Sequence, residues 1–196
     1  SEIYPGEALY ALSEMYKTFG DEVYKERFDY AAKFYDKREF WTKSAFMPWT
    51  ISALSNMYLL TKEEYYLDYA KKITDRMLVT QNMNPKSMEY GSWNPLPMVN
   101  SSTCMEALGD LSLALELAGD EEELNYYTSH SIIGYRWLMG LQFTQDEMDG
   151  IEQPNYALGG FPASKTERKI RIDNTQHSIT ALSKGLMNVY KQEPKL

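Results

Sequence analysis

Apolar residues recur at three- and four-residue spacing along most of the chain, which is the pattern of helices that bury one face. The first stripe contains Leu9, Leu12 and Tyr16. Pro5 suits the first turn of this helix, and Gly20 suits its left-handed end. The same reasoning predicts an all-α fold with about seven main helices, at residues 5–20, 21–37, 49–60, 61–79, 103–119, 120–141 and 174–191.

Polar residues at the helix starts define the expected boundaries. Ser, Thr and Asp side chains accept hydrogen bonds from the free amides of the first turn, and Glu three residues later completes a capping box. The expected caps are Asp21, Asp120 and Asp173, and the expected capping boxes are Thr61 with Glu64 and Thr103 with Glu106.

Short phrases of the sequence repeat. Ala-Leu-Ser occurs at residues 11–13, 53–55 and 181–183, and Gly-Asp-Glu occurs at residues 20–22 and 119–121. Repetition at intervals of tens of residues predicts helical hairpins in a solenoid or a closed ring. The first, third, fifth and seventh helices are rich in small residues and Leu, so we expect them to form an inner layer. The other three carry most of the charges and should form an outer layer.

Loop lengths alternate along the chain. The turns within hairpins are tight, whereas the connections between hairpins are long, at residues 38–48, 81–102 and 142–172. Because the helices alternate in direction, all three long loops should emerge on the face that holds the N-termini of the inner helices. Long ordered loops on one side of a repeat array are usually functional.

Aligning the inner helices brings four residues with ionisable or aromatic side chains to equivalent first-turn positions. They are Glu7, Trp49, Glu106 and His177. In a ring, two acids, an indole and an imidazole would converge on one mouth. The loops add aromatic, amide and charged residues: Trp41, Phe46, Tyr90, Trp93, Asn94, Asn100, Tyr156, Phe161, Arg171 and Asp173. Aromatic rings beside amides and carboxylates are typical of sugar-binding surfaces.

Asp173 and His177 are four residues apart, which is one helical turn. A carboxylate beside an imidazole favours the charged ring and suits acid–base chemistry near neutral pH. Structural interpretations stand beside this one. Asp173 can act only as a cap, Arg171 can simply pair with Asp173, and an acid such as Glu7 in a first turn complements the helix dipole.

Composition narrows the function classes. The 196 residues, 43% hydrophobic and 24% charged, predict one globular domain over residues 1–196. A net charge of −8 argues against nucleic-acid binding, and no apolar stretch is long enough to span a membrane. Two histidines and a single cysteine, Cys104, give no metal site and no intrachain disulfide, so we expect a buried structural thiol and no cofactor. The cellular compartment stays open.

The opening phrase YPGEALYALSEMYKTFGDEVY, its echoes and the closing GGFPAS…RIDNTQH resemble the (α/α)-toroid proteins that act on carbohydrates. This group includes six-hairpin glycosidases, N-acylglucosamine 2-epimerase-like proteins and some polysaccharide lyases. The resemblance implies an active site at the ring mouth, on the side of the long loops. It also implies about six hairpins, whereas three and a half are predicted here. The chain therefore has the pattern of the C-terminal part of a longer toroid, with a preceding part as a possible partner.

These observations favour a carbohydrate-active hydrolase in which Asp173 and Glu106 share the acid and base roles. His177 and Arg171 would orient the substrate, with Glu7, Trp49 and the loop residues Tyr90, Trp93, Asn94 and Phe161 binding the sugar. Two carboxyl groups flanking the bond are what most glycosidases use. A non-catalytic glycan- or peptide-binding module, a polysaccharide lyase and a sugar epimerase are the alternatives.

Overall fold

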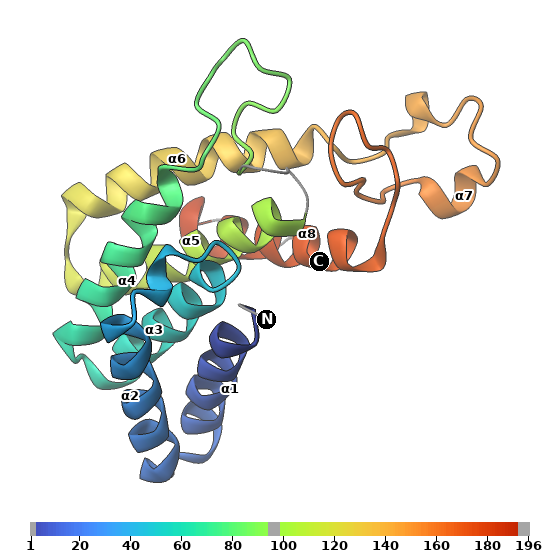
Figure 1. The fold of residues 1–196 in the computed structure, drawn as a ribbon. Coiled ribbons are helices and arrows are strands. Elements are labelled where there is room, and N and C mark those ends of the chain that lie inside the picture. Colours follow the sequence, from blue (N-terminus) through green and yellow to red (C-terminus); the bar gives the residue numbers. More distant parts are fainter. Residues whose placement is uncertain (1–2, 94–98, 192–196) are drawn as a thin grey trace.

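The computed structural model describes residues 3–93 and 99–191, and this part of the chain is helical (Figure 1). The all-α prediction is therefore confirmed. The main helices are α1 (Tyr4–Phe19), α2 (Glu22–Lys37), α3 (Met47–Thr61), α4 (Glu64–Leu78), α5 (Val99–Ala118), α6 (Glu121–Met139) and α8 (Ile172–Lys184). The shorter elements are two 3₁₀ turns, η1 (Phe40–Thr42) and η2 (Gln145–Glu147), the single turn α7 (Pro154–Ala157) and a π-helical turn, η3 (Gly185–Val189).

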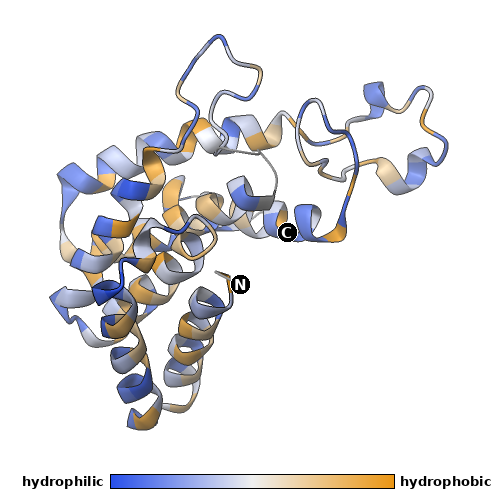
Figure 2. Ribbon diagram, viewed as in Figure 1, coloured by the Kyte–Doolittle hydropathy of each residue, from blue (hydrophilic) through white to orange (hydrophobic). Residues whose placement is uncertain are grey.

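The helices form two layers, as the repeat pattern predicts. In the inner row, α1 packs on α3, α3 on α5, and α5 on α8. The outer helices α2, α4 and α6 cover α1, α3 and α5, in that order. Apolar and hydrophilic residues alternate around the ribbons of the first hairpin, α1 and α2 (Figure 2). No helix within the described residues combines the length and apolar character that crossing a bilayer requires.

The hydrophobic core is centred on α3, which has neighbours on both flanks and on its outer side. Ile51, Leu54 and Met57 are fully buried there, and Phe28 of α2 meets Tyr66 of α4 edge-on. Burial of this kind contributes about 25 cal/mol per Å² of apolar surface, so the centre of the row is the most strongly held part. The site described below rests on this helix.

Glycines allow the inner helices to approach closely at two places. A Cβ atom on Gly6 of α1 would lie 2.9 Å from the backbone oxygen of Phe46 and 2.9 Å from Trp49 Cβ. A Cβ atom on Gly109 of α5 would lie 2.9 Å from Lys184 Cβ on α8. Both distances are too short for a side chain, so these glycines set the spacing of the row.

Several predicted helix starts are wrong by one turn or less. α5 begins at Val99 rather than Thr103, whose hydroxyl donates to the Asn100 carbonyl within the helix. Thr61 does not cap α4, because it ends α3 and its hydroxyl donates back to the Met57 carbonyl. In contrast, the caps at Asp21 and Asp120 are confirmed, since each carboxylate accepts a first-turn amide.

Asp173 is not an N-cap either. α8 begins one residue earlier, at Ile172, and the Asp173 carboxylate is turned toward Arg171. The predicted end of this helix at residue 191 also changes, because α8 stops at Lys184 and continues as the π-helical turn η3. Gly185 lies directly against the Tyr135 ring at this junction.

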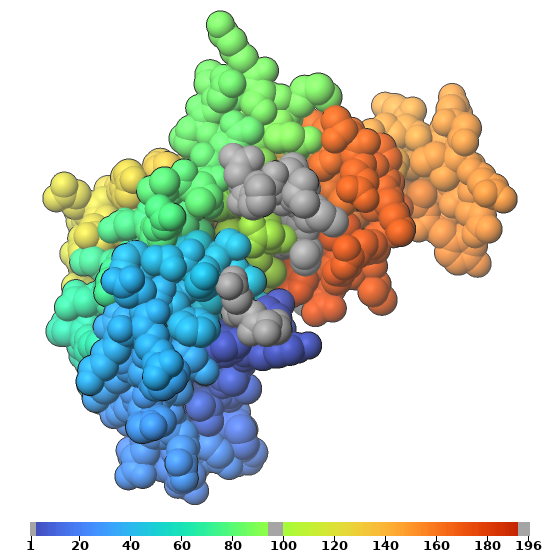
Figure 3. Space-filling view, viewed as in Figure 1, coloured from blue at the N-terminus to red at the C-terminus, as the bar shows by residue number. Residues whose placement is uncertain are grey.

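The longest connection, between α6 and α8, folds into a lobe with a small core of its own. Phe143, Met148 and Ala157 form this core, and Ile170 packs against it. The lobe, orange in Figure 3, stands out from the helical body. An isolated antiparallel bridge joins Pro162 and Ile170, shortly before α8.

Substituting Gly6 tests whether close contact between α1 and α3 is required. Gly6→Ala should lower the free energy of unfolding by about 1–3 kcal/mol, because the added methyl group collides with backbone. Thr18→Ala, at an exposed position of the same helix, should change it by less than about 0.5 kcal/mol. Urea denaturation followed by circular dichroism measures both. Equal effects of the two substitutions would contradict the tight contact.

Candidate functional site

The N-terminal turns of all four inner helices surround one cavity of about 270 Å³. Seven of its lining residues belong to the first two turns of these helices, and the other two, Ile3 and Ala45, lie just before α1 and α3. The complete lining is Ile3, Glu7, Ala45, Pro48, Trp49, Asn100, Thr103, Asp173 and His177. We call this the mouth cavity. Three of the four register-equivalent residues, Glu7, Trp49 and His177, therefore meet there. The fourth, Glu106, reaches it through His177.

Glu106 and His177 form a pair that joins α5 to α8. His177 Nδ1 lies 2.7 Å from Glu106 Oε1, although the two residues are 71 positions apart. Both side chains are largely buried, with 10% of Glu106 and 15% of His177 exposed. Because both side chains are largely buried, this contact limits the rotation of the ring.

This contact also selects the tautomer of His177. An ionised carboxylate only accepts hydrogen bonds, so neutral His177 must carry its proton on Nδ1. Nε2 then has a free lone pair, and no hydrogen bond to it is found among the described residues. An imidazole oriented by a carboxylate behind it is the arrangement that general bases use. Glu106 thus acts on the cavity by positioning His177.

Asp173 lines the mouth cavity but is held by Arg171. Arg171 Nε donates to Asp173 Oδ1 over 3.0 Å, and Arg171 Nη2 donates to Asp173 Oδ2. The side chains are 46% and 34% exposed, so the pair lies at the solvent edge of the cavity. With both oxygens engaged, Asp173 is better placed to accept a substrate hydroxyl than to deliver a proton.

Trp49 forms one wall of the mouth cavity. Its indole meets the His177 ring at 5.8 Å between centroids and an interplanar angle of 77°, and it touches Tyr10 on the other side. This support from two rings holds the half-buried indole rigidly. Glu7 lies on the neighbouring helix and lines the same cavity. Within the described residues, its carboxylate has no hydrogen bond or ion pair.

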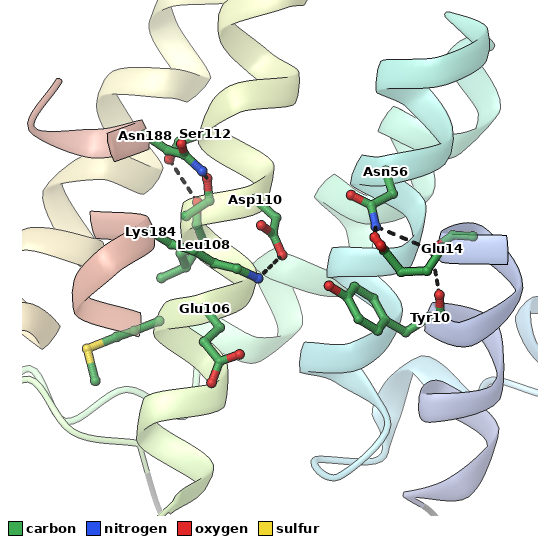
Figure 4. A network of polar contacts seen from close by, with 12 residues as sticks. Tyr10, Glu14, Asn56, Glu106, Leu108, Asp110, Ser112, Lys184 and Asn188 are labelled. Atoms are coloured by element: carbon green, nitrogen blue, oxygen red, sulfur yellow. Dashed lines mark hydrogen bonds and ion pairs between the residues drawn. The ribbon is translucent and has the colours of Figure 1, made fainter. Parts of the chain in front are cut away.

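Polar residues continue below the mouth cavity along the inner faces of the helices (Figure 4). Lys184 of α8 donates to Asp110 of α5 over 2.6 Å, and Asn56 of α3 donates to Glu14 of α1 over 2.7 Å. Tyr10 of α1 extends toward Asp110 and Lys184. The interior of the row is therefore polar along its length, whereas the flanks between its helices consist of small and apolar residues.

The Asp110–Lys184 pair is deeply placed, with only 14% and 18% of the side chains exposed. Burial by itself lowers the pKa of Lys184, but the charge and hydrogen bond of Asp110 outweigh this and raise it above its ordinary value. Lys184 is thus a fixed positive charge, two helical turns beyond His177 in sequence. It offsets part of the negative charge of the nearby carboxylates.

Some residues expected at the site lie elsewhere. Trp93 is fully buried and Phe161 is 2% exposed, so neither ring can stack on a ligand in this structure. Both sit in the core because their loops fold back onto the helices. Tyr90 lines a different cavity, together with Trp137 and Arg136. Asn94 lies outside the described residues.

A larger cavity of about 790 Å³ lies beside the lobe and contains none of the predicted site residues. Its lining is Met88, Gly140, Phe143, Glu147, Ile151, Ala157, Lys165, Arg168 and Ile170. Arg168 stacks on Phe143 and pairs with Glu147, and Lys165 is the remaining titratable residue of the lining. The mouth cavity, which holds an imidazole oriented by a carboxylate, is therefore the stronger candidate site despite its smaller volume.

Other chemistry finds no support in the described residues. Cys104 is buried, and burial raises the pKa of its thiol, as expected for a structural cysteine. No cluster of three or more His, Cys, Asp or Glu side chains suited to a metal ion is found in residues 3–93 and 99–191.

The deeper polar residues could have been found from the sequence. Glu14, Asn56 and Lys184 each lie seven positions after a register-equivalent residue, which is two helical turns along the same face. Asp110 follows Glu106 by four positions. Extending the alignment of the four first turns down each helix therefore predicts the polar interior. The pairing of these residues was not predictable, because it depends on how the helices are spaced.

Comparison of the chain with known protein families, with curated proteins and with solved structures gives no match. The toroid resemblance consequently rests on the repeat pattern of the sequence.

Because the Asp110–Lys184 pair is buried, losing one of its partners should cost more stability than breaking an exposed ion pair. Asp110→Ala should lower the free energy of unfolding by about 3–5 kcal/mol, because it leaves the Lys184 charge buried without its partner. Adding Lys184→Met should restore much of this loss. Glu116 lies on the same helix as Asp110 and forms a half-exposed pair with Lys191. Glu116→Ala should lower the free energy of unfolding by no more than about 1 kcal/mol. Similar losses at Asp110 and Glu116 would show that the pair is solvated.

Proposed function

We propose that the protein is a carbohydrate-active enzyme that hydrolyses a glycosidic bond at the mouth cavity. The observation that carries this proposal is the convergence on one cavity of a supported indole, an imidazole oriented by a carboxylate, and a second carboxylate, Glu7, that has no partner among the described residues. An indole wall suits the apolar face of a pyranose ring. A hydrolase further needs one group that accepts a proton and one that donates a proton.

The roles follow from the partners of each side chain. His177 accepts the proton of a water molecule at Nε2 as the water oxygen attacks the anomeric carbon. Glu7, in its protonated form, donates a proton to the departing glycosidic oxygen. Glu106 is a positioning residue that holds His177. This assignment differs from the two-carboxylate scheme expected from the sequence, because Glu106 and Asp173 are both engaged by other side chains.

Asp173 and Arg171 would then bind sugar hydroxyls at the rim, with Asn100 and Thr103 contributing polar atoms on the α5 side. The all-α hairpin layers and the placement of the cavity among inner-helix N-termini support the likeness to carbohydrate-active (α/α) toroids. In that group the active site occupies the corresponding face.

One observation favours a second candidate, a polysaccharide lyase. The group best arranged for chemistry in the mouth cavity is a base, the Glu106–His177 pair, and lyases need a base that removes a proton from a sugar carbon. The products separate the two candidates. Hydrolysis gives two saturated sugars with a new reducing end, whereas elimination gives an unsaturated sugar that absorbs ultraviolet light.

A panel of oligosaccharides, analysed for both kinds of product, tests the proposal. His177→Gln should reduce kcat by about 10²- to 10⁴-fold because the general base is lost, with little change in sugar affinity. Glu7→Gln should reduce kcat by a similar factor for substrates with a poor leaving group. Trp49→Ala should instead weaken binding, because it removes the stacking wall.

His130→Gln is the matched control. His130 is a half-buried histidine on α6 that contacts Gln81 and does not line the mouth cavity. It should leave kcat unchanged. Binding of sugars without any turnover by the wild-type protein would show a binding module rather than an enzyme. Turnover that survives His177→Gln would remove His177 from the chemistry.

A further inference from the structure

Within the part of the chain that the structure describes, two helix flanks at the ends of the inner row lack the contacts that the equivalent flanks of the other inner helices make. Ser13, Ser55, Ser112 and Ser183 occupy the same register position on the four inner helices. The first three are fully buried, whereas Ser183 is exposed. Asn56 of α3 contacts Ser13, so Ser13 lies on the flank of α1 that faces α3.

The opposite flank shows the same pattern at the other end of the row. Ala53 of α3 and Ala181 of α8 are fully buried, and the α5 residue at this register, Asp110, is largely buried, but Ala11 of α1 is exposed. One turn earlier, Thr50 and Ser178 are buried while Ala8 is exposed. One turn later, Met57 and Gly185 are buried while Met15 is exposed.

The free flank of α1 is thus a continuous stripe of small and apolar residues. It consists of Tyr4, Ala8, Ala11, Met15 and Phe19, of which Tyr4 and Phe19 are each 67% exposed. On α8 the exposed residues of the corresponding flank include Gln176, Ile179, Ser183 and Met187. The chain uses this pair of flanks three times internally, at α1–α3, α3–α5 and α5–α8. Each end of the row carries one unmatched half of the same interface.

We propose that a second copy of this chain covers these flanks, with α8 of one copy packed on α1 of the next. The two flanks are expected to be complementary, because the equivalent flanks of neighbouring inner helices already pack against each other within the chain. Small residues on both sides allow the backbones to approach, and the apolar stripe on α1 is removed from water. The contact joins different surfaces on the two copies, so it is a head-to-tail interface that extends the inner row.

A head-to-tail interface uses a different flank on each copy, so it can be tested by one substitution in each flank. Ala11→Arg should place a charge in the α1 flank, and Ser183→Arg should do so in the α8 flank. Either substitution damages every interface in a pure sample, so each variant alone should be monomeric, with a mass of 22.8 kDa. A mixture of the two variants still contains one intact flank of each kind. It should form a heterodimer that grows no further.

Light scattering coupled to size-exclusion chromatography, from micromolar to submillimolar protein, measures these masses. The wild-type protein should show at least twice the monomer mass, and the control Val79→Arg, at a residue 73% exposed on the end of α4, should match it. Circular dichroism and thermal melting confirm that each variant folds.

A wild-type chain that stays monomeric throughout would overturn the proposal and assign the two flanks to helices of another polypeptide. Association that persists in both arginine variants would place the contact elsewhere on the surface. A mixture that forms assemblies larger than two would also contradict a head-to-tail interface through these flanks.

Discussion

The spacing between neighbouring inner helices is the constraint on which the rest of the structure depends. Gly6 and Gly109 let α1 approach α3 and let α5 approach α8 more closely than a side chain would permit. Buried serines and alanines occupy the same flanks, so the contacts between helices are short along their length. Close spacing leaves little room in the interior of the row, and the polar side chains that point there must satisfy one another.

The need of each buried polar side chain for a partner explains how the residues of the site are paired. Residues on the interior face come from different helices yet lie within hydrogen-bond distance, as in Glu106 with His177 and Asp110 with Lys184. A polar group in such a place is tolerated only with a partner, because leaving it unsatisfied costs about 1–3 kcal/mol. The same pairing orients His177, so the requirement of folding and the requirement of the proposed chemistry coincide at this residue. Trp49 closes the space above it.

Much of the fold and part of the site could be predicted from the sequence, because both depend on periodicity. Helix type, layer order and the meeting of Glu7, Trp49 and His177 follow from apolar spacing and repeat register. The loop residues could not be placed in this way. Trp93 fits a ligand platform by composition but is buried, since no periodic pattern fixes how a long loop folds back. Asp173 fits a helix cap by type, but pairing with Arg171 determines its position.

The protonation of His177 tests the central claim most directly, because it depends on α5 and α8 bringing Glu106 and the imidazole together. Nitrogen-15 NMR of the histidine-labelled protein resolves two side chains, and His130→Gln assigns them. The account predicts that neutral His177 carries its proton on Nδ1 and that Glu106→Ala abolishes this preference. A neutral ring protonated on Nε2, unchanged by Glu106→Ala, would contradict it.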